Sequence, residues 1–258
     1  MQHVYVFGLL ALPALLAGQY SETINSGRPG QSIGAVPVGR DIYQLETGLS
    51  INWIGEGGNQ IADYAETTTI RVGVLERLEV NVDVSGASVL APADGPNHRD
   101  RGINNTEIGI RYQVFEQRGW RPALAVQGHL LLTAQDEDFR RPRTGSSFTL
   151  IADWEFSEAL LVTANLLRSY NGDGTQNTEY VTTLGMELSD RWSTYMEVYG
   201  ALSETVTANY DGGFAFLIAD DVAADVSAGW QGQDGLNDYF LDFGISFRIN
   251  GRRSMLPE

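Results

Sequence analysis

The sequence predicts an all-β protein, a transmembrane antiparallel up-and-down β-barrel of about 12 strands. Polar and apolar residues alternate along most of the chain after residue 40, as in strands with two different faces. The connections between these segments are alternately short and long, and aromatic residues gather at the segment ends. The 29 glycines and 8 prolines suit many strands joined by tight turns.

The composition narrows the class of protein further. The mean hydropathy of −0.17 excludes a bundle of membrane-spanning helices. The absence of cysteine excludes disulfides, thiolate metal sites and a cysteine nucleophile. The net charge is −16 and all 17 basic residues are arginine, so nucleic acid is not expected as a partner, because its binding relies on cationic groups.

The N-terminus resembles an export signal. Residues 4–17 form an apolar run that is too short to span a membrane, although Gln2 and His3 stand where positive charges are usual. We expect a signal peptide over 1–18; a buried strand or short helix is the alternative. Residues 19–40 are predicted to be an irregular periplasmic N-terminal segment, either a tail in the periplasm or a plug entering the lumen. Gly27, Pro29 and Pro37 argue against a strand there.

The barrel is expected over 41–250, with a C-terminal tail over 251–258. In the seventh segment the apolar Leu161 and Leu167 lie on the otherwise polar face. The prediction of the tenth strand is based on Phe214, Phe216 and Ile218 alone. In chain order, the apolar faces run over Tyr43–Trp53, Thr68–Val74, Leu78–Val84, Ile108–Val114, Leu124–Leu132, Phe148–Trp154, Leu160–Leu166, Tyr180–Leu188, Trp192–Leu202, Phe214–Ile218, Val222–Trp230 and Tyr239–Phe247.

The lengths of the connections predict the orientation of the barrel. Short turns are expected at Leu75–Arg77, Ser157–Glu158, Ser189–Arg191 and Ala219–Asp221, with a longer one near Glu116–Arg121. Longer polar loops are expected at Gly55–Ala62, Ser88–Gly102, Gln135–Gly145, Asn171–Asn177, Ser203–Asp211 and Gly232–Asn237. One rim of tight turns and one of long loops is typical of outer-membrane barrels, with both chain ends in the periplasm.

Alternation alone does not decide which face points inward, and a soluble barrel would bury the apolar face. A barrel of about 12 strands is too wide for side chains to fill as an apolar core. The aromatic residues suggest two belts around a lipid-facing band. One belt borders the long loops (Trp53, Phe148, Tyr180, Tyr210, Trp230, Tyr239) and the other the short turns (Trp154, Phe156, Trp192, Phe247). We therefore expect outer-membrane lipid to surround the barrel.

The inward face then carries most of the charge. We expect Arg71 to lie opposite Asn81, diagonally between Glu79 and Asp83, and to begin an ionic ladder along the wall. Carboxylates outnumber arginines, so an open lumen should favour cations; a closed, charge-plugged barrel is the alternative. The expected lumen-lining residues are Glu46, Arg71, Glu79, Asp83, Glu107, Arg111, His129, Asp153, Glu187, Glu197, Asp225, Asp242 and Arg248.

Two hairpins carry a family resemblance. The stretch Thr67–Val80, and the stretch Thr106–Val114 continued by Pro122–Ala125 and Leu130–Thr133, resemble the MetA-pathway phenol-degradation family of outer-membrane transporter-like barrels. The likeness extends over about Asp41–Phe247, although Leu132–Gln135 departs from the family's Pro-Thr-Gly ending. The resemblance implies passage of small solutes, with aromatic or hydrophobic compounds among the candidates. It supplies no functional residues to transfer.

The expected function is a channel or transporter for small solutes in the outer membrane of a Gram-negative-type bacterium. The alternatives are a structural or adhesion barrel with a closed lumen, or an outer-membrane hydrolase. No catalytic site is expected, because His129 lacks a nearby Ser motif and His98 lies in a loop. No metal or cofactor is expected: Asn171–Gly174 and Gln233–Asp238 fit turns better than calcium loops. Barrel-assembly machinery is the expected partner during biogenesis.

Overall fold

The computed structural model describes residues 22–55, 61–90, 98–233 and 236–251. The expected signal peptide and most of the C-terminal tail lie outside these residues. Among the described residues, no helix is long and apolar enough to cross a membrane.

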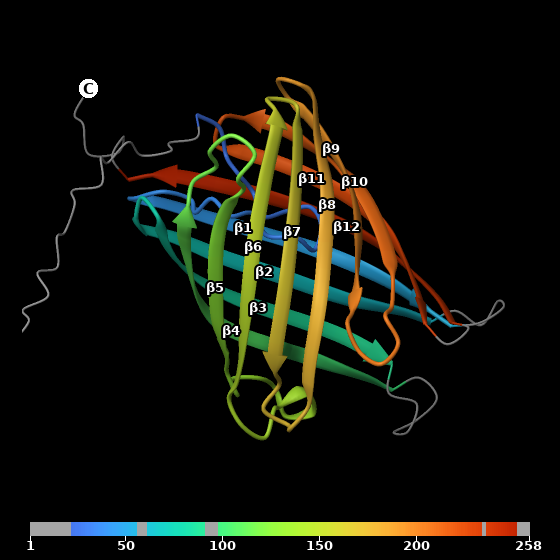
Figure 1. The fold of residues 1–258 in the computed structure, drawn as a ribbon. Coiled ribbons are helices and arrows are strands. Elements are labelled where there is room, and N and C mark those ends of the chain that lie inside the picture. Colours follow the sequence, from blue (N-terminus) through green and yellow to red (C-terminus); the bar gives the residue numbers. More distant parts are fainter. Residues whose placement is uncertain (1–21, 56–60, 91–97, 234–235, 252–258) are drawn as a thin grey trace, which may run out of the picture.

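Twelve antiparallel strands close into one barrel, which confirms the predicted fold class (Figure 1). Each strand pairs with its neighbours in sequence, and β1 pairs with β12 to close the sheet. Strand lengths run from 9 residues in β5 to 17 in β4, enough to cross a bilayer at a tilt. The strands are β1 (Ile42–Ile54), β2 (Ile61–Leu75), β3 (Leu78–Leu90), β4 (Arg99–Phe115), β5 (Ala123–Leu131), β6 (Gly145–Ser157), β7 (Leu160–Tyr170), β8 (Gln176–Ser189), β9 (Trp192–Ala201), β10 (Asn209–Ala219), β11 (Val222–Gln233) and β12 (Leu236–Asn250).

The connections alternate as predicted. Four of the five hairpins on one rim have two residues between strands, and the other rim carries the longer loops, one with the 3-10 turn η2 (Glu137–Phe139). Each even strand from β2 to β10 shifts register just before its connection on the short-turn rim. Such a bulge adds one residue to the strand and strengthens its twist, which helps the sheet to curve.

Several strands extend further towards the long loops than the alternation indicated. β3 continues to Leu90 and β4 begins at Arg99, where a loop was expected over Ser88–Gly102. The ladder persists there through polar pairs such as Ser88 with Arg101. Near the long loops the side chains no longer alternate between apolar and polar, although the backbones of β3 and β4 still form hydrogen bonds. β5 instead stops one residue early: Leu131 points inward, buried, and Leu132 lies outside the strand.

The apolar face points outward. Ile110, Leu130 and Phe148 have about half of their surface exposed (51%, 55% and 53%), whereas polar residues on the opposite face are buried. Such a continuous apolar exterior suits lipid rather than water.

Aromatic residues form a belt beside the long loops on four adjacent strands. Trp53 pairs with Tyr239, Tyr239 with Trp230, and Trp230 with Tyr210, and the last two rings stack at 6.2 Å between centroids. Near the short turns, the rings of Trp192 and Phe216 lie 4.7 Å apart. Rings at these two levels fit a membrane's two polar–apolar boundaries.

The described part of the N-terminal segment, residues 22–40, contains no helix or strand. Its backbone bonds inward side chains of β1, β3, β6, β7 and β9, so it lies within the lumen, and it is the dark blue trace of Figure 1. The sequence left two alternatives for these residues, a tail in the periplasm and a plug in the lumen. Carboxylates on the lumen wall accept hydrogen bonds from N–H groups that no sheet satisfies, which favours the plug.

Candidate functional site

Four charged side chains on β1 to β4 form the densest part of the lumen wall. Arg71 donates from Nε and Nη2 to the two carboxylate oxygens of Glu79, each at 2.9 Å, and from Nη1 to Glu46 Oε1 at 3.0 Å. Arg111 Nη2 donates to Glu79 Oε1 at 2.7 Å. Glu79 is fully buried, and the two arginines are each 3% exposed. Buried charges persist only when paired and hydrogen-bonded in this way.

The expected position of Arg71 is confirmed, since it pairs with Asn81 across β2 and β3. The bulge near Val74 preserves this register despite the short turn. The ladder differs from the expectation at one point, because Arg71 bridges Glu79 and Glu46 and not Asp83. Asp83 instead accepts a hydrogen bond from Thr69 Oγ1 at 2.6 Å and lies near His129.

Inward carboxylates hold the N-terminal segment by its backbone. Glu197 accepts from Gln31 N at 2.7 Å and Ser32 N at 3.1 Å. Asp153 accepts from Ala35 N at 2.7 Å, and Thr163 Oγ1 donates to the same carboxylate at 2.9 Å. Charge-assisted bonds of this kind are about twice as strong as neutral ones.

Side chains of β1, β3 and β7 also form hydrogen bonds with the backbone of the N-terminal segment. Glu46 accepts from Gly27 N at 3.0 Å and Glu79 from Val38 N at 2.9 Å. Asn165 Oδ1 accepts from Ile33 N at 2.7 Å, and its amide donates back to the Ile33 carbonyl at 2.9 Å. The wall therefore grips the segment from several sides.

Arg28 anchors the segment through its side chain. Its guanidinium contacts Asp242 and lies 3.3 Å from Asp225. It occupies a slot above Gly48 and Gly244, which pair across β1 and β12, and a Cβ on either glycine would overlap it. Burial lowers the pKa of Arg28, but the two carboxylates outweigh it and hold that pKa above its ordinary value.

The remaining expected lumen residues lie towards the rims or in the middle of the wall. Arg248 binds Asp221 at 2.6 Å and donates to the carbonyls of Glu22 and Thr23 at the short-turn rim. Glu187 is exposed at the same rim and lines a cavity there. Glu107 and His129 are half-buried on β4 and β5 beside Asp83.

Sequence reasoning missed several inward polar residues. Arg28 carries no strand periodicity, so nothing in the sequence could have placed it. Asp63 pairs with Arg99 at 2.9 Å; Asp63 lay before the expected start of its strand, and Arg99 had been assigned to a loop. Asp211 and Tyr195 are also buried on the inward face. Extending the alternation of β10 backwards from Phe214 would have found Asp211.

Several cavities lie along the lumen. One of about 300 Å³ opens at the short-turn side and is lined by Leu161, Met186 and Glu187 among others. Another of about 400 Å³ lies towards the long loops, beside Leu167, Tyr180 and Tyr199. A third of about 300 Å³ borders Arg28, Arg71 and Asp83. Leu161 and Leu167, which blurred the seventh segment's pattern, thus give the end cavities apolar walls.

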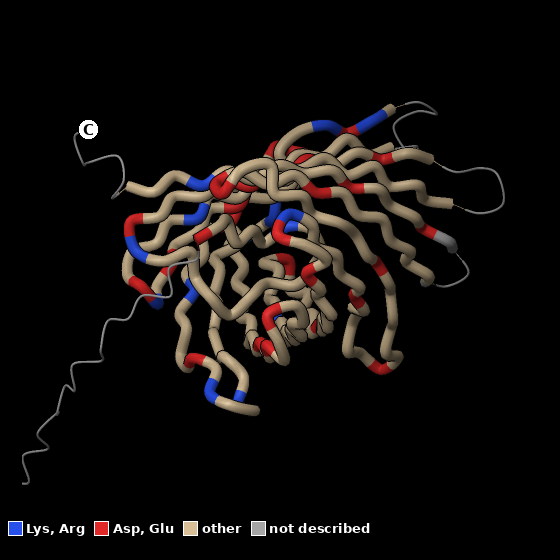
Figure 2. The backbone as a smooth tube through the Cα atoms, turned by 90° about the horizontal axis from the view of Figure 1, so that it is seen from above, with Lys and Arg blue, Asp and Glu red and all other residues tan. Residues whose placement is uncertain are grey.

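The acidic character of the chain extends over strands and loops alike (Figure 2). The chain has 33 acidic residues against 17 basic ones. Several inward carboxylates have no arginine within ion-pair distance among the described residues; Asp153, Glu197 and Asp211 are examples. The lumen is therefore a negatively charged, partly filled passage.

A sequence profile of the family described as "Putative MetA-pathway of phenol degradation" matches residues 26–249. The chain belongs to this family. The match spans most of the chain, including the part of the N-terminal segment that enters the lumen. The family resemblance drawn from the two hairpins is thereby confirmed.

Solved structures share the fold. An outer membrane channel from Pseudomonas putida F1 aligns with a TM-score of 0.63 and 7% identity, over 86% of this chain and 100% of that one. A KdgM porin in complex with disordered oligogalacturonate aligns with a TM-score of 0.53 and 7% identity, over 78% and 98% of the two chains. No curated protein matches the chain in sequence. The protein is thus an outer-membrane-type barrel.

Proposed function

We propose that the protein is an outer-membrane channel for small solutes, with residues 22–40 as a plug inside its lumen. The observation that carries this proposal is the pair of cavities at the two ends of the lumen, with the hydrogen-bonded plug between them. A purely structural barrel needs no such openings. An apolar exterior and a polar interior support the same function.

The solutes that we favour are small compounds with both an apolar and a polar part. Each end cavity combines leucine or tyrosine side chains with polar groups, as ligand sites generally do. The family's description names phenol degradation, and a phenol has such a mixed character. The porin's oligogalacturonate shows that this fold also hosts large polar solutes in other proteins.

The proposal includes no catalysis. Ser147 lies opposite His129 across β5 and β6, yet no hydrogen bond joins the two side chains in the described chain. A serine hydrolase needs its hydroxyl within reach of the imidazole, with an oxyanion hole beside it. Outer-membrane lipid around the barrel and barrel-assembly machinery during biogenesis belong to the same proposal, since a barrel of this kind must be inserted.

The test is single-channel recording in planar bilayers with the purified protein. Arg28→Gln removes the guanidinium that binds Asp225 and Asp242 and leaves the wall intact. We expect brief, rare openings in the wild type and an increase of about 10-fold or more in open time in the variant, because each 1.4 kcal/mol lost from the plugged state is worth that factor.

Arg40→Gln is the matched control, because Arg40 lies in the same segment but is exposed, and its one ion pair among the described residues is with its neighbour Asp41. Its open time should stay at the wild-type value. A wild type and an Arg28→Gln variant that both never conduct would refute the channel and favour the closed structural barrel. Liposome uptake of phenol, compared with a sugar of similar size, then tests the solute class.

A further inference from the structure

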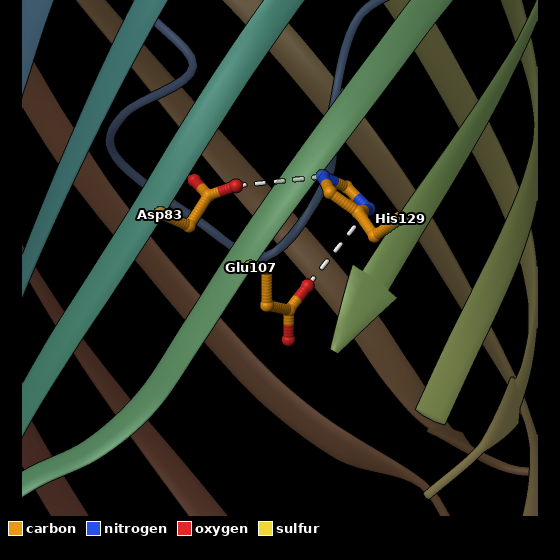
Figure 3. Close-up of side chains that lie close together, drawn as sticks. All are labelled: Asp83, Glu107 and His129. Carbon is orange, nitrogen blue, oxygen red and sulfur yellow. Dashed lines mark ion pairs between the residues drawn. The ribbon is translucent and has the colours of Figure 1, made fainter. Parts of the chain in front are cut away.

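Three potential metal ligands meet on the lumen wall, one on each of three neighbouring strands. Asp83 lies on β3, Glu107 on β4 and His129 on β5 (Figure 3). His129 Nε2 is 3.4 Å from Asp83 Oδ2, and Nδ1 is 3.9 Å from Glu107 Oε2. One candidate ligand atom from each residue lies within 4.8 Å of the others.

The charges of this group are not balanced. Asp83 and Glu107 pair directly across β3 and β4, and like charges in such a pair repel. Four residues away along β3, Glu79 pairs instead with Arg111, so the same two strands also hold a compensated pair. Among the described residues, no arginine forms an ion pair with Asp83 or Glu107; the neutral Thr69 and Asn105 donate to them, and His129 is the one basic side chain within ion-pair distance. A bound cation would remove the repulsion.

The surroundings are shaped around the imidazole. His129 pairs with Gly109 across β4 and β5, and a Cβ at Gly109 would overlap the ring and Asn81 Oδ1. The missing side chain lets the ring reach across β4 towards β3. Asn81 Oδ1 lies 3.1 Å from His129 Nε2, and Thr69 orients Asp83 from the far side. The bond from Thr69 is of the kind that fixes the orientation of a metal ligand, and the Asn81 contact at Nε2 leaves Nδ1 as the ring nitrogen for an ion.

The buried side chain of Gln127, beside His129, has an oxygen without a hydrogen-bond partner among the described residues. Gln127 is 4% exposed, and its amide nitrogen lies 3.1 Å from His129 Nε2. Its Oε1 is buried without a hydrogen-bond partner in the described chain. Buried polar atoms are rarely left in this state, so an oxygen beside the imidazole is available for a ligand.

We propose that Asp83, Glu107 and His129 bind one divalent transition-metal ion of the zinc class, with water at the remaining position. One imidazole and two carboxylates are ligands that suit zinc and its neighbours better than calcium or magnesium. Bonds of roughly 2.0–2.2 Å require the ligand atoms to approach further, so the half-buried Glu107 side chain would have to rotate towards the imidazole. The cavity of about 300 Å³ beside Asp83 and Gln127 gives the ion a route from the lumen.

Zinc binding to the purified, EDTA-treated barrel tests this site directly and does not depend on conduction. Equilibrium dialysis should give one tightly bound Zn²⁺ per chain. His129→Ala should weaken that binding by roughly 10-fold or more, since even supporting residues of metal sites change affinity by that factor. His98→Ala is the matched control, because His98 is half-exposed beside Asp100, away from β5.

An EPR measurement on the wild-type protein tests the same site without depending on a variant that could disturb the fold. Cu²⁺ bound to the wild type should show nitrogen hyperfine splitting from a single imidazole in its EPR spectrum, and His98→Ala should leave that signal unchanged. The proposal is overturned if wild-type protein binds no Zn²⁺ stoichiometrically, if His129→Ala binds as tightly as wild type, or if the nitrogen signal disappears in His98→Ala.

Discussion

At the scale of single residues, the inward charges divide into two kinds. Glu46, Glu79, Arg71 and Arg111 neutralise one another in a buried network. Asp153 and Glu197 have no arginine partner among the described residues and accept backbone N–H groups of the plug, as Glu46 and Glu79 also do. The first kind stabilises the wall, because removing one member would leave the charge of its partner buried and uncompensated. The second kind holds a segment that could be released without breaking the barrel.

Replacing Glu79 with glutamine should destabilise the barrel strongly. Arg71 would keep only Glu46, and Arg111 would lose its one ion-pair partner among the described residues; breaking a buried pair costs roughly 3–5 kcal/mol. Urea titration of the refolded protein in lipid vesicles measures the loss. Glu187→Gln is the control; its side chain is exposed at the rim and should change stability by less than about 0.5 kcal/mol. Equal effects of both substitutions would contradict the bracing role.

The loop between β7 and β8 contains a carboxylate with a lowered pKa. Thr175 donates to Asp173 Oδ1 from its hydroxyl and its backbone N–H, each at 2.7 Å, and these bonds lower the pKa of Asp173 below its usual value. Asx-turn chemistry thus explains Asn171–Gly174 without calcium. The carboxylate favours the folded loop above its unfolded pKa, and this contribution disappears as the pH falls through the lowered pKa.

Thr175→Val should raise the pKa of Asp173 towards 3.8 by removing the hydroxyl donor. Carboxyl-carbon NMR during an acid titration measures this pKa in detergent micelles. Thr178→Val is the control, since Thr178 Oγ1 contacts Arg168 and not Asp173. A Thr175→Val pKa no higher than that of wild type would show that the hydroxyl bond does not cause the shift.

At the scale of elements, the period-two pattern predicted every strand, because one face of each strand meets lipid and the other meets polar groups. Strand ends were harder to predict. Beyond the apolar band both faces of a strand meet water, and the pattern of β3 and β4 stops before their hydrogen bonds do. The bulges before the short turns were also missed, since no residue type marks them. The hydrogen bond from Gln31 N to Glu197 joins residues that are 166 positions apart in the sequence, and a local hydrophobic period cannot predict such a contact.

The short-turn rim should face the periplasm and the long-loop rim the cell surface. Because the chain has no cysteine, single substitutions give a clean test of this orientation. Asp138→Cys, exposed in the turn η2, should react in intact cells with a membrane-impermeant maleimide. Asp190→Cys, exposed in the turn between β8 and β9, should react only after permeabilisation. The reverse labelling pattern would invert the topology.

At the scale of the whole molecule, charge is the property that the fold organises. The exterior of the strands is mostly apolar and many carboxylates are buried on the inward face, so the excess of acidic residues acts where a solute would pass. A passage with low-dielectric walls concentrates the field of such charges. Across β9 and β10, Asp211 lies directly opposite Glu197, and neither pairs with an arginine among the described residues.

The channel should therefore prefer cations to anions. Reversal potentials in a gradient of potassium chloride measure this preference, and they should shift towards the equilibrium potential of potassium. Glu197→Gln should reduce the shift, because it removes one inward charge. Glu66→Gln should leave it unchanged, because Glu66 pairs with the outward Leu49 and is exposed on the outer face. Raising the salt concentration should weaken the preference in both proteins, since the screening length falls to about 3 Å at 1 M. Anion preference, or equal effects of the two substitutions, would contradict an acidic lumen as the source of selectivity.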